Sequence, residues 1–131
     1  MTASHARGYL LDTRALLWWL AEPSKLSDDA RSAIADGSNT VCVSAAAAWE
    51  IAVKKGLGRL DVPNNLPEVL HADRIEVLPI TLEHALAVAD LPMHHQDPFD
   101  RMQIAQAKVE ALVLVTRDAL MSRYDVPLLN A

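Results

Sequence analysis

The stretch YLLDTRALLWWLAEP, residues 9–23, decides the fold class. Residues 9–11 form a short apolar run, Asp12 and Thr13 interrupt it, and helix-forming apolar residues follow from Ala15 to Leu20. This order predicts a strand, a turn and a helix. The same signals predict strands over 41–43, 76–78, 111–115 and 127–129, and helices over 27–36, 45–55, 67–71, 81–90 and 98–110, with a short helix that begins at Asp118.

The predicted strands are continuously apolar, whereas half-buried strands would alternate apolar and polar residues. Continuous apolar strands separated by helices indicate an α/β fold whose parallel sheet is covered by helices on both faces. Ligands of such sheets bind beyond the carboxyl ends of the strands. Asp12 and the run Thr116-Arg117-Asp118 fall at such ends.

Length and composition fit one soluble domain. The chain has 131 residues, of which 51% are hydrophobic and 22% charged, and we expect a tail over 1–7 and a single domain over 8–131. The only cysteine, Cys42, excludes an internal disulfide and fits a reducing cytoplasm. The most apolar stretch, residues 9–21, contains two charged residues and is shorter than the roughly 20 residues of a membrane span.

The net charge of −5 argues against a nucleic-acid binder that relies on a broad basic face. Bound cations would change that balance and place positive charge where a phosphate could sit. The acids therefore become the first place to look for a site.

Four acids stand beside apolar elements rather than on polar faces: Asp12, Glu50, Asp100 and Asp118. Glu50 lies in a helix that is apolar on nearly every side, where an unpaired carboxylate is costly. A metal shared with Asp12 and Asp100 would offset that cost. Oxygen ligands without cysteine or paired histidines favour Mg²⁺ or Mn²⁺, ions that promote phosphodiester hydrolysis.

Each acid also has a purely structural explanation. Asp12 and Asp118 are placed to cap helices, and Glu50 is placed to pair with Lys54 one turn later. Asp97, Pro98 and Asp100 form a typical helix start, in which Asp100 only complements the helix dipole. Capping alone does not require four acids that one sheet edge could gather.

Four segments resemble PIN-domain ribonucleases, and more narrowly VapC-type toxins of bacterial toxin–antitoxin pairs. They are LLDT (10–13) followed by LLWWL (16–20), SAAAAWEI (44–51), HQDPFDRM (95–102) and VTRD (115–118), in the right order over nearly the whole chain. The resemblance implies a three-layer α/β/α sandwich around a central parallel sheet. It also implies an Mg²⁺-dependent endoribonuclease, a homodimer, and an antitoxin that blocks the acidic pocket.

By position, the family's metal-binding and catalytic acids fall on Asp12, Glu50, Asp100 and Asp118. Thr116 matches a family position whose hydroxyl lies near these acids. Arg14 stands where the group usually has histidine, and an arginine can bind phosphate with two hydrogen bonds but cannot act as a base.

Other residues have weaker signals. Arg101 and Arg117 each neighbour a proposed ligand and are expected to contact substrate or to support the site. Trp18 and Trp19 leave their helix about 100° apart, so we expect one of them to be partly exposed.

Two other functions stay open. A phosphoacceptor receiver also uses strand-end acids and Mg²⁺, but it needs an acid pair near the first strand and a lysine after the last, and neither is seen. A PIN domain whose nuclease site has decayed could serve as a binding protein, although the acids are intact. The RNA that is cut cannot be read from the sequence, because specificity depends on loop shape and stacking.

Overall fold

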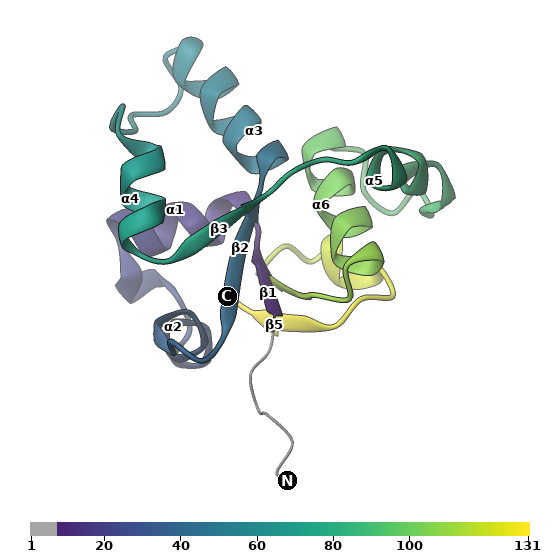
Figure 1. The fold of residues 1–131 in the computed structure, drawn as a ribbon. Helices are drawn as coiled ribbons and strands as arrows, with labels where there is room; N and C mark the ends of the chain where they lie inside the picture. The colour runs from purple at the N-terminus through teal and green to yellow at the C-terminus, as the bar shows by residue number, and fades with distance from the viewer. Residues whose placement is uncertain (1–7) are drawn as a thin grey trace, which may run out of the picture.

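Five parallel strands form one central sheet in the computed structural model, which describes residues 8–131 (Figure 1). The strands are β1 (Gly8–Leu11), β2 (Thr40–Ser44), β3 (Ile75–Leu78), β4 (Val113–Thr116) and β5 (Leu128–Asn130), and their order across the sheet is β3-β2-β1-β4-β5. The prediction of a parallel sheet is confirmed, with each strand within a few residues of its expected place. The predicted tail, residues 1–7, lies outside the described residues.

Within residues 8–131, six helices connect the strands. They are α1 (Thr13–Ala21), α2 (Asp28–Ala35), α3 (Ala45–Gly56), α4 (Leu66–Ala72), α5 (Leu82–Ala87) and α6 (Pro98–Val109), together with the 3₁₀ turns η1 (Pro23–Lys25), η2 (Val88–Asp90) and η3 (Met121–Arg123). None of the helices in the described part of the chain is both long and apolar enough to cross a membrane.

Capping side chains set where the helices nearest the sheet edge begin. Asp12 caps α1, Ser44 caps α3 and Asp97 caps α6, each by accepting a hydrogen bond from a backbone N–H of the first turn. The helix predicted to begin at Asp118 is absent. Instead Asp118 Oδ1 accepts from the Leu120 N–H at 2.8 Å, and bonds between residues three apart tighten the following segment into η3.

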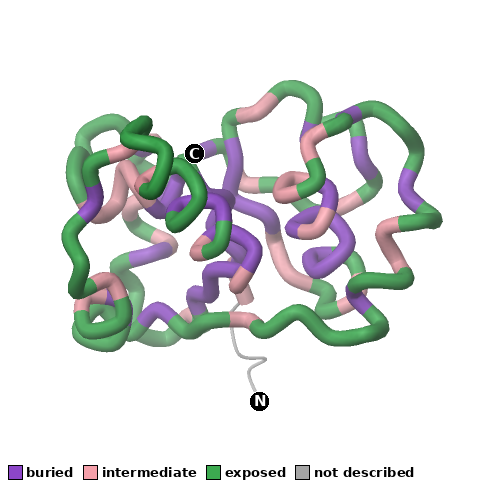
Figure 2. The backbone as a smooth tube through the Cα atoms, turned by 90° about the horizontal axis from the view of Figure 1, so that it is seen from above, coloured by how far each residue is buried: buried purple, intermediate pink, exposed green. Residues whose placement is uncertain are grey.

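The two faces of the sheet have separate cores. Leu11 and Val115 pack with α1, α2 and α4 on one face, whereas Leu10 and Leu114 pack with α6 on the other. Figure 1 shows α1, α2 and α4 on one side of the sheet and α5 and α6 on the other, and Figure 2 shows the buried segments in the middle. Both faces are thus covered, which explains why the strands carry no polar alternation and confirms the three-layer α/β/α sandwich.

The chain reverses its direction of travel across the sheet between β1 and β4. From β1 it adds β2 and β3 on one side, and then it returns to place β4 and β5 on the other. Ligands of open α/β sheets bind beyond the carboxyl ends of the strands where the strand order reverses. Asp12 follows β1 directly, and Asp118 follows β4 after Arg117.

Candidate functional site

Asp12 is buried at the carboxyl end of β1, where it both caps a helix and faces β4. Its Oδ1 accepts from the Ala15 N–H at 2.7 Å, and its Oδ2 accepts from the Thr116 hydroxyl at 2.6 Å. Burial raises the pKa of Asp12, although these two hydrogen bonds act in the opposite direction. Capping therefore accounts for one oxygen of Asp12, and the bond to Thr116 ties the other to the neighbouring strand.

Thr116 links Asp12 to Asp118. While its hydroxyl donates to Asp12, the same oxygen accepts from the Asp118 N–H at 3.0 Å. Burial alone would raise the pKa of Asp118, but hydrogen bonds from His95 and from the Leu120 N–H outweigh it and hold that pKa below its ordinary value. Asp118 is therefore charged at neutral pH, and its charge adds to the cost of ionising Asp12.

His95 lies between Asp100 and Asp118. Its Nε2 is 3.0 Å from Asp100 Oδ2 and 2.9 Å from Asp118 Oδ2, and its Nδ1 accepts from the Asp97 N–H at 3.2 Å. Because Nδ1 accepts, the proton of the neutral ring must sit on Nε2, where the two carboxylates share it. His95, Asp100 and Asp118 also form a group whose ligand atoms lie within 4.8 Å of one another.

Asp100 is a second acid whose ionisation the site opposes. Burial is the largest cause of its raised pKa, and the charge of Asp97 adds to it. Together with smaller contributions from Glu50 and Asp118, these raise the pKa of Asp100 to about 7, although His95 acts in the opposite direction. Asp97 itself caps α6 by accepting from the Asp100 N–H at 3.0 Å, as predicted.

Glu50 completes the group of acids from α3. Its Oε1 accepts from the Thr13 hydroxyl at 2.7 Å, and its Oε2 pairs with Lys54 at 2.7 Å, which confirms the expected contact one turn along the helix. Glu50 is buried, while Lys54 is half exposed at the rim. The negative charge of Glu50 reaches Asp100, so the four acids share one edge of the sheet.

The three arginines expected near the site lie in three different environments. Arg14 is exposed on α1, and its charge lowers the pKa of Asp12. Arg101 is buried, and its guanidinium donates to carbonyl oxygens within residues 88–95 and to the Tyr124 hydroxyl. These bonds fit a role in supporting the site, not a contact with substrate. Arg117 stacks on Trp18, 4.4 Å from the ring centre, and donates to the Ala131 carbonyl oxygen.

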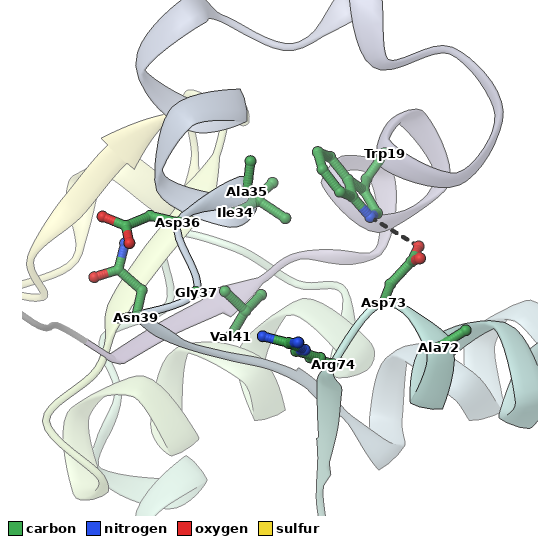
Figure 3. A pocket seen from close by; sticks show the side chains of 10 residues that line it. All are labelled: Trp19, Ile34, Ala35, Asp36, Gly37, Asn39, Val41, Ala72, Asp73 and Arg74. Carbon is green, nitrogen blue, oxygen red and sulfur yellow. Dashed lines mark hydrogen bonds between the residues drawn. The ribbon is translucent and has the colours of Figure 1, made fainter.

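The two tryptophans are both partly buried. Trp18 lies beneath Arg117, and Trp19 Nε1 donates to Asp73 at 3.1 Å. Figure 3 shows this bond at the edge of a pocket on the opposite, amino-terminal edge of the sheet, lined also by Ile34, Val41 and Arg74. None of the four predicted acids lines that pocket.

Sequence reasoning missed four side chains that hold the acids: Thr13, His95, Gln103 and Tyr124. Tyr124 fixes the loop that carries His95, because its hydroxyl accepts from the His95 N–H at 2.8 Å and donates to the Pro92 carbonyl oxygen at 2.7 Å. A signal existed for Gln103, a glutamine on a helix face that is otherwise buried. The loop of His95 has no periodic pattern that would have shown where its side chain points.

An apolar groove runs beside the acids between α3, α5 and the start of α6. Trp49 and Phe99 are among its lining residues, and their rings meet edge to face with centres 4.9 Å apart. Each ring belongs to the residue directly before an acid, Glu50 or Asp100. None of the four acids lines this groove, and consecutive helix residues point about 100° apart, so the groove is a surface next to the acids and not part of their cluster.

The donor set suits a hard divalent cation. Carboxylates from four separate parts of the chain lie near one another, and burial together with mutual repulsion raises the pKa of Asp12 and Asp100. Among the described residues, only His95, Asp100 and Asp118 place their ligand atoms within 4.8 Å of one another. A cation among them would remove that repulsion, and oxygen-rich sites are those that Mg²⁺ and Mn²⁺ occupy. The described residues thus fit such an ion.

Solved structures of other proteins share this fold. Solved structures with the same fold include VapBC2 from Rickettsia felis bound to a DNA fragment from their promoter (17% identity, 94% of this chain and 98% of that chain, TM-score 0.71) and VapBC-1 from nontypeable Haemophilus influenzae (16%, 94% and 97%, TM-score 0.67). DNA-bound VapBC from Salmonella typhimurium is also similar (17%, 94% and 97%, TM-score 0.66). No curated protein sequence matches the chain. A model of the PIN domain matches residues 9–127, nearly the whole described chain, and the protein therefore belongs to the PIN domain family.

Proposed function

We propose that this PIN domain is a metal-dependent endoribonuclease and the toxin of a toxin–antitoxin pair. The observation that carries the proposal is that Asp12, Glu50, Asp100 and Asp118 lie near one another at the edge of the sheet where the strand order reverses. Capping accounts for one oxygen of Asp12, but Glu50 lies within α3 and caps no helix, so capping does not explain the whole group.

Asp12, Glu50, Asp100 and Asp118 would hold Mg²⁺, with Mn²⁺ able to replace it. When bound, the ion supplies an activated water and neutralises charge on the phosphodiester. The residues around the acids keep them in place: Thr116 fixes Asp12, and His95 fixes Asp100 relative to Asp118.

Cationic side chains at the rim would bind the phosphates next to the scissile bond. Lys54 is paired with Glu50 yet half exposed, and Arg14 is exposed close enough to Asp12 to lower its pKa. A guanidinium can hold a phosphate with two parallel hydrogen bonds. The site would therefore bind its charged substrate locally, although the whole chain is acidic.

Single-stranded RNA suits the surface beside the acids. Trp49 is 60% exposed, and its ring is braced by Phe99. Exposed aromatic rings stack on unpaired bases and add affinity without sequence preference. A base on Trp49 would bring its neighbouring phosphate toward Glu50.

An antitoxin and a second copy of the chain are the proposed protein partners, in the cytoplasm. The solved neighbours are VapBC complexes, which supports an antitoxin. Large apolar side chains are exposed on α3, α5 and the loop before α6, and surfaces of this kind usually contact another protein. They include Val53, Leu82, Leu86 and Met93.

Cleavage of RNA by the purified protein with Mg²⁺ tests the proposal. Asp12→Asn should abolish cleavage and, on expression, growth arrest, whereas Asp61→Asn, a change at an exposed acid outside the site, should alter neither. Cleavage by Asp12→Asn in EDTA would refute the metal-dependent reaction.

The same preparation separates the other functions. A chain that neither cleaves RNA nor takes up Mn²⁺ in calorimetry would be a decayed PIN domain. Transfer of an acid-labile phosphoryl group from acetyl phosphate would instead identify a receiver.

A further inference from the structure

Two fully buried glutamines of α6, Gln103 and Gln106, each have an amide oxygen without a hydrogen-bond partner among the described residues. A buried acceptor that makes no hydrogen bond destabilises the fold, and such groups are rare in proteins. Leucine has a similar size and would remove this cost at either position. Each glutamine therefore needs a function that offsets this cost. The partners of the amide N–H group differ between the two glutamines and indicate that function.

The N–H groups of the two glutamines reach different parts of the molecule. Gln103 Nε2 donates to Thr13 Oγ1 and to the Phe99 carbonyl oxygen, both at 3.3 Å. Gln106 Nε2 donates to the Pro79 carbonyl oxygen at 3.3 Å and lies 3.4 Å from His84 Nδ1. Gln103 is thus connected to the acids, while Gln106 is connected to the start of α5.

Thr13 continues the connection from Gln103 to Glu50. Its hydroxyl donates to Glu50 Oε1 at 2.7 Å, and the oxygen of that hydroxyl accepts from Gln103. Because the Gln103 N–H approaches this oxygen, the Thr13 hydroxyl proton has to point elsewhere, and Glu50 is the acceptor within reach. Lys54 holds the other oxygen of Glu50, so both carboxylate oxygens are fixed from outside.

We propose that Gln103 is a positioning residue that orients the Glu50 carboxylate through the Thr13 hydroxyl. The inference deepens the proposed nuclease function and rests on it. Gln103 lies three residues after Asp100, on the same side of α6. One helix therefore supplies Asp100 and also the amide that sets where Glu50 points, which fixes the relation between two acids from different helices.

The matched pair Gln103→Leu and Gln106→Leu tests the proposal on the whole chain. Each variant loses an unpaired buried oxygen and also an amide donor, so the two melting temperatures should change by similar amounts. Gln103→Leu should lower kcat for RNA cleavage with Mg²⁺ by about 10- to 100-fold with KM unchanged, as changes in residues that orient metal ligands do. It should also weaken Mn²⁺ binding in calorimetry, and Gln106→Leu should change neither quantity.

A double-mutant cycle with Thr13→Val identifies the route. If Gln103 acts through Thr13, the double variant Thr13→Val/Gln103→Leu should be no slower, and bind Mn²⁺ no more weakly, than Thr13→Val alone. Additive losses would overturn the proposal, as would equal effects of the two leucine variants.

Failure of the nuclease function can be told apart from failure of this inference. If the wild-type chain cleaves no RNA, the proposed function is wrong. The Mn²⁺ affinities of the variants alone then test whether Gln103 positions Glu50. Weaker binding by Gln103→Leu than by Gln106→Leu would support it. Equal affinities, or a wild-type chain that takes up no Mn²⁺, would overturn it.

Discussion

Replacing Asp100 by asparagine should stabilise the metal-free protein at pH 8 and leave its stability at pH 4 nearly unchanged. Burial, followed by the charge of Asp97 and smaller contributions, raises the pKa of Asp100 from 3.8 to about 7. Between these two values the folded protein keeps a proton that the unfolded chain has lost. The free energy of unfolding therefore falls as the pH rises through this range. Asparagine cannot ionise, so the variant lacks this loss.

The size of the effect follows from the shift and from the exposure of the side chain. A pKa that moves from 3.8 to about 7 corresponds to roughly 4 kcal/mol between the two protonation states. The Asp100 side chain is 20% exposed and next to open solvent, and screening reduces the contribution to about 1–2 kcal/mol. For a chain of this length, that is a rise in melting temperature of roughly 3–10 °C at pH 8.

Thermal unfolding in EDTA, followed by circular dichroism at pH 4, 6 and 8, measures the effect. Asp118→Asn is the control with the opposite sign. Hydrogen bonds from His95 and Leu120 hold the pKa of Asp118 below its ordinary value despite partial burial, so its carboxylate contributes stability above about pH 4. That variant should be slightly less stable at pH 8. An Asp100→Asn protein that melts at or below the wild-type temperature at pH 8 would refute the reasoning.

Two further predictions concern the same acids. Thr116→Val removes the 2.6 Å hydrogen bond to Asp12 and should reduce RNA cleavage by about 10- to 100-fold, while Thr40→Val, at an exposed position of β2, should leave cleavage unchanged in the same assay. Mn²⁺ affinity measured by calorimetry should rise by about tenfold between pH 6 and 8 and then level off, because the cation replaces the proton of Asp100; an affinity that is independent of pH would contradict this.

The sheet could be predicted because its strands are buried on both faces. Leu10 faces one core and Leu11 the other, so a continuous apolar run was the correct signal. β3 is less regular, because Glu76 and Val77 are exposed near the edge of the sheet. The segment after Asp118 was the part of the fold predicted wrongly, since a capping side chain alone does not decide between an α-helix and a 3₁₀ turn.

The four acids could be singled out along the chain, because each lies in or beside an apolar element. Lys54 and Thr116 were expected near them, but their other partners were not predicted. His95 reaches Asp100 and Asp118 only because Arg101 and Tyr124 hold its loop through backbone groups, and no residue pattern encodes contacts of that kind. Arg101 shows that a neighbour in sequence need not be a neighbour in the site. It follows Asp100 directly, but its guanidinium donates to carbonyl oxygens of the loop before α6.

The distribution of the four carboxylates along the chain has a consequence during synthesis. Asp12 and Glu50 leave the ribosome first, but Asp100 and Asp118 belong to the last third of the chain, and β4 must pair with β1 before Asp12 and Asp118 meet. A nascent chain that ends before α6 therefore carries half of the cluster and lacks the strand that completes it. The proposed activity would thus require that the chain has been made past β4 and that β4 has paired with β1.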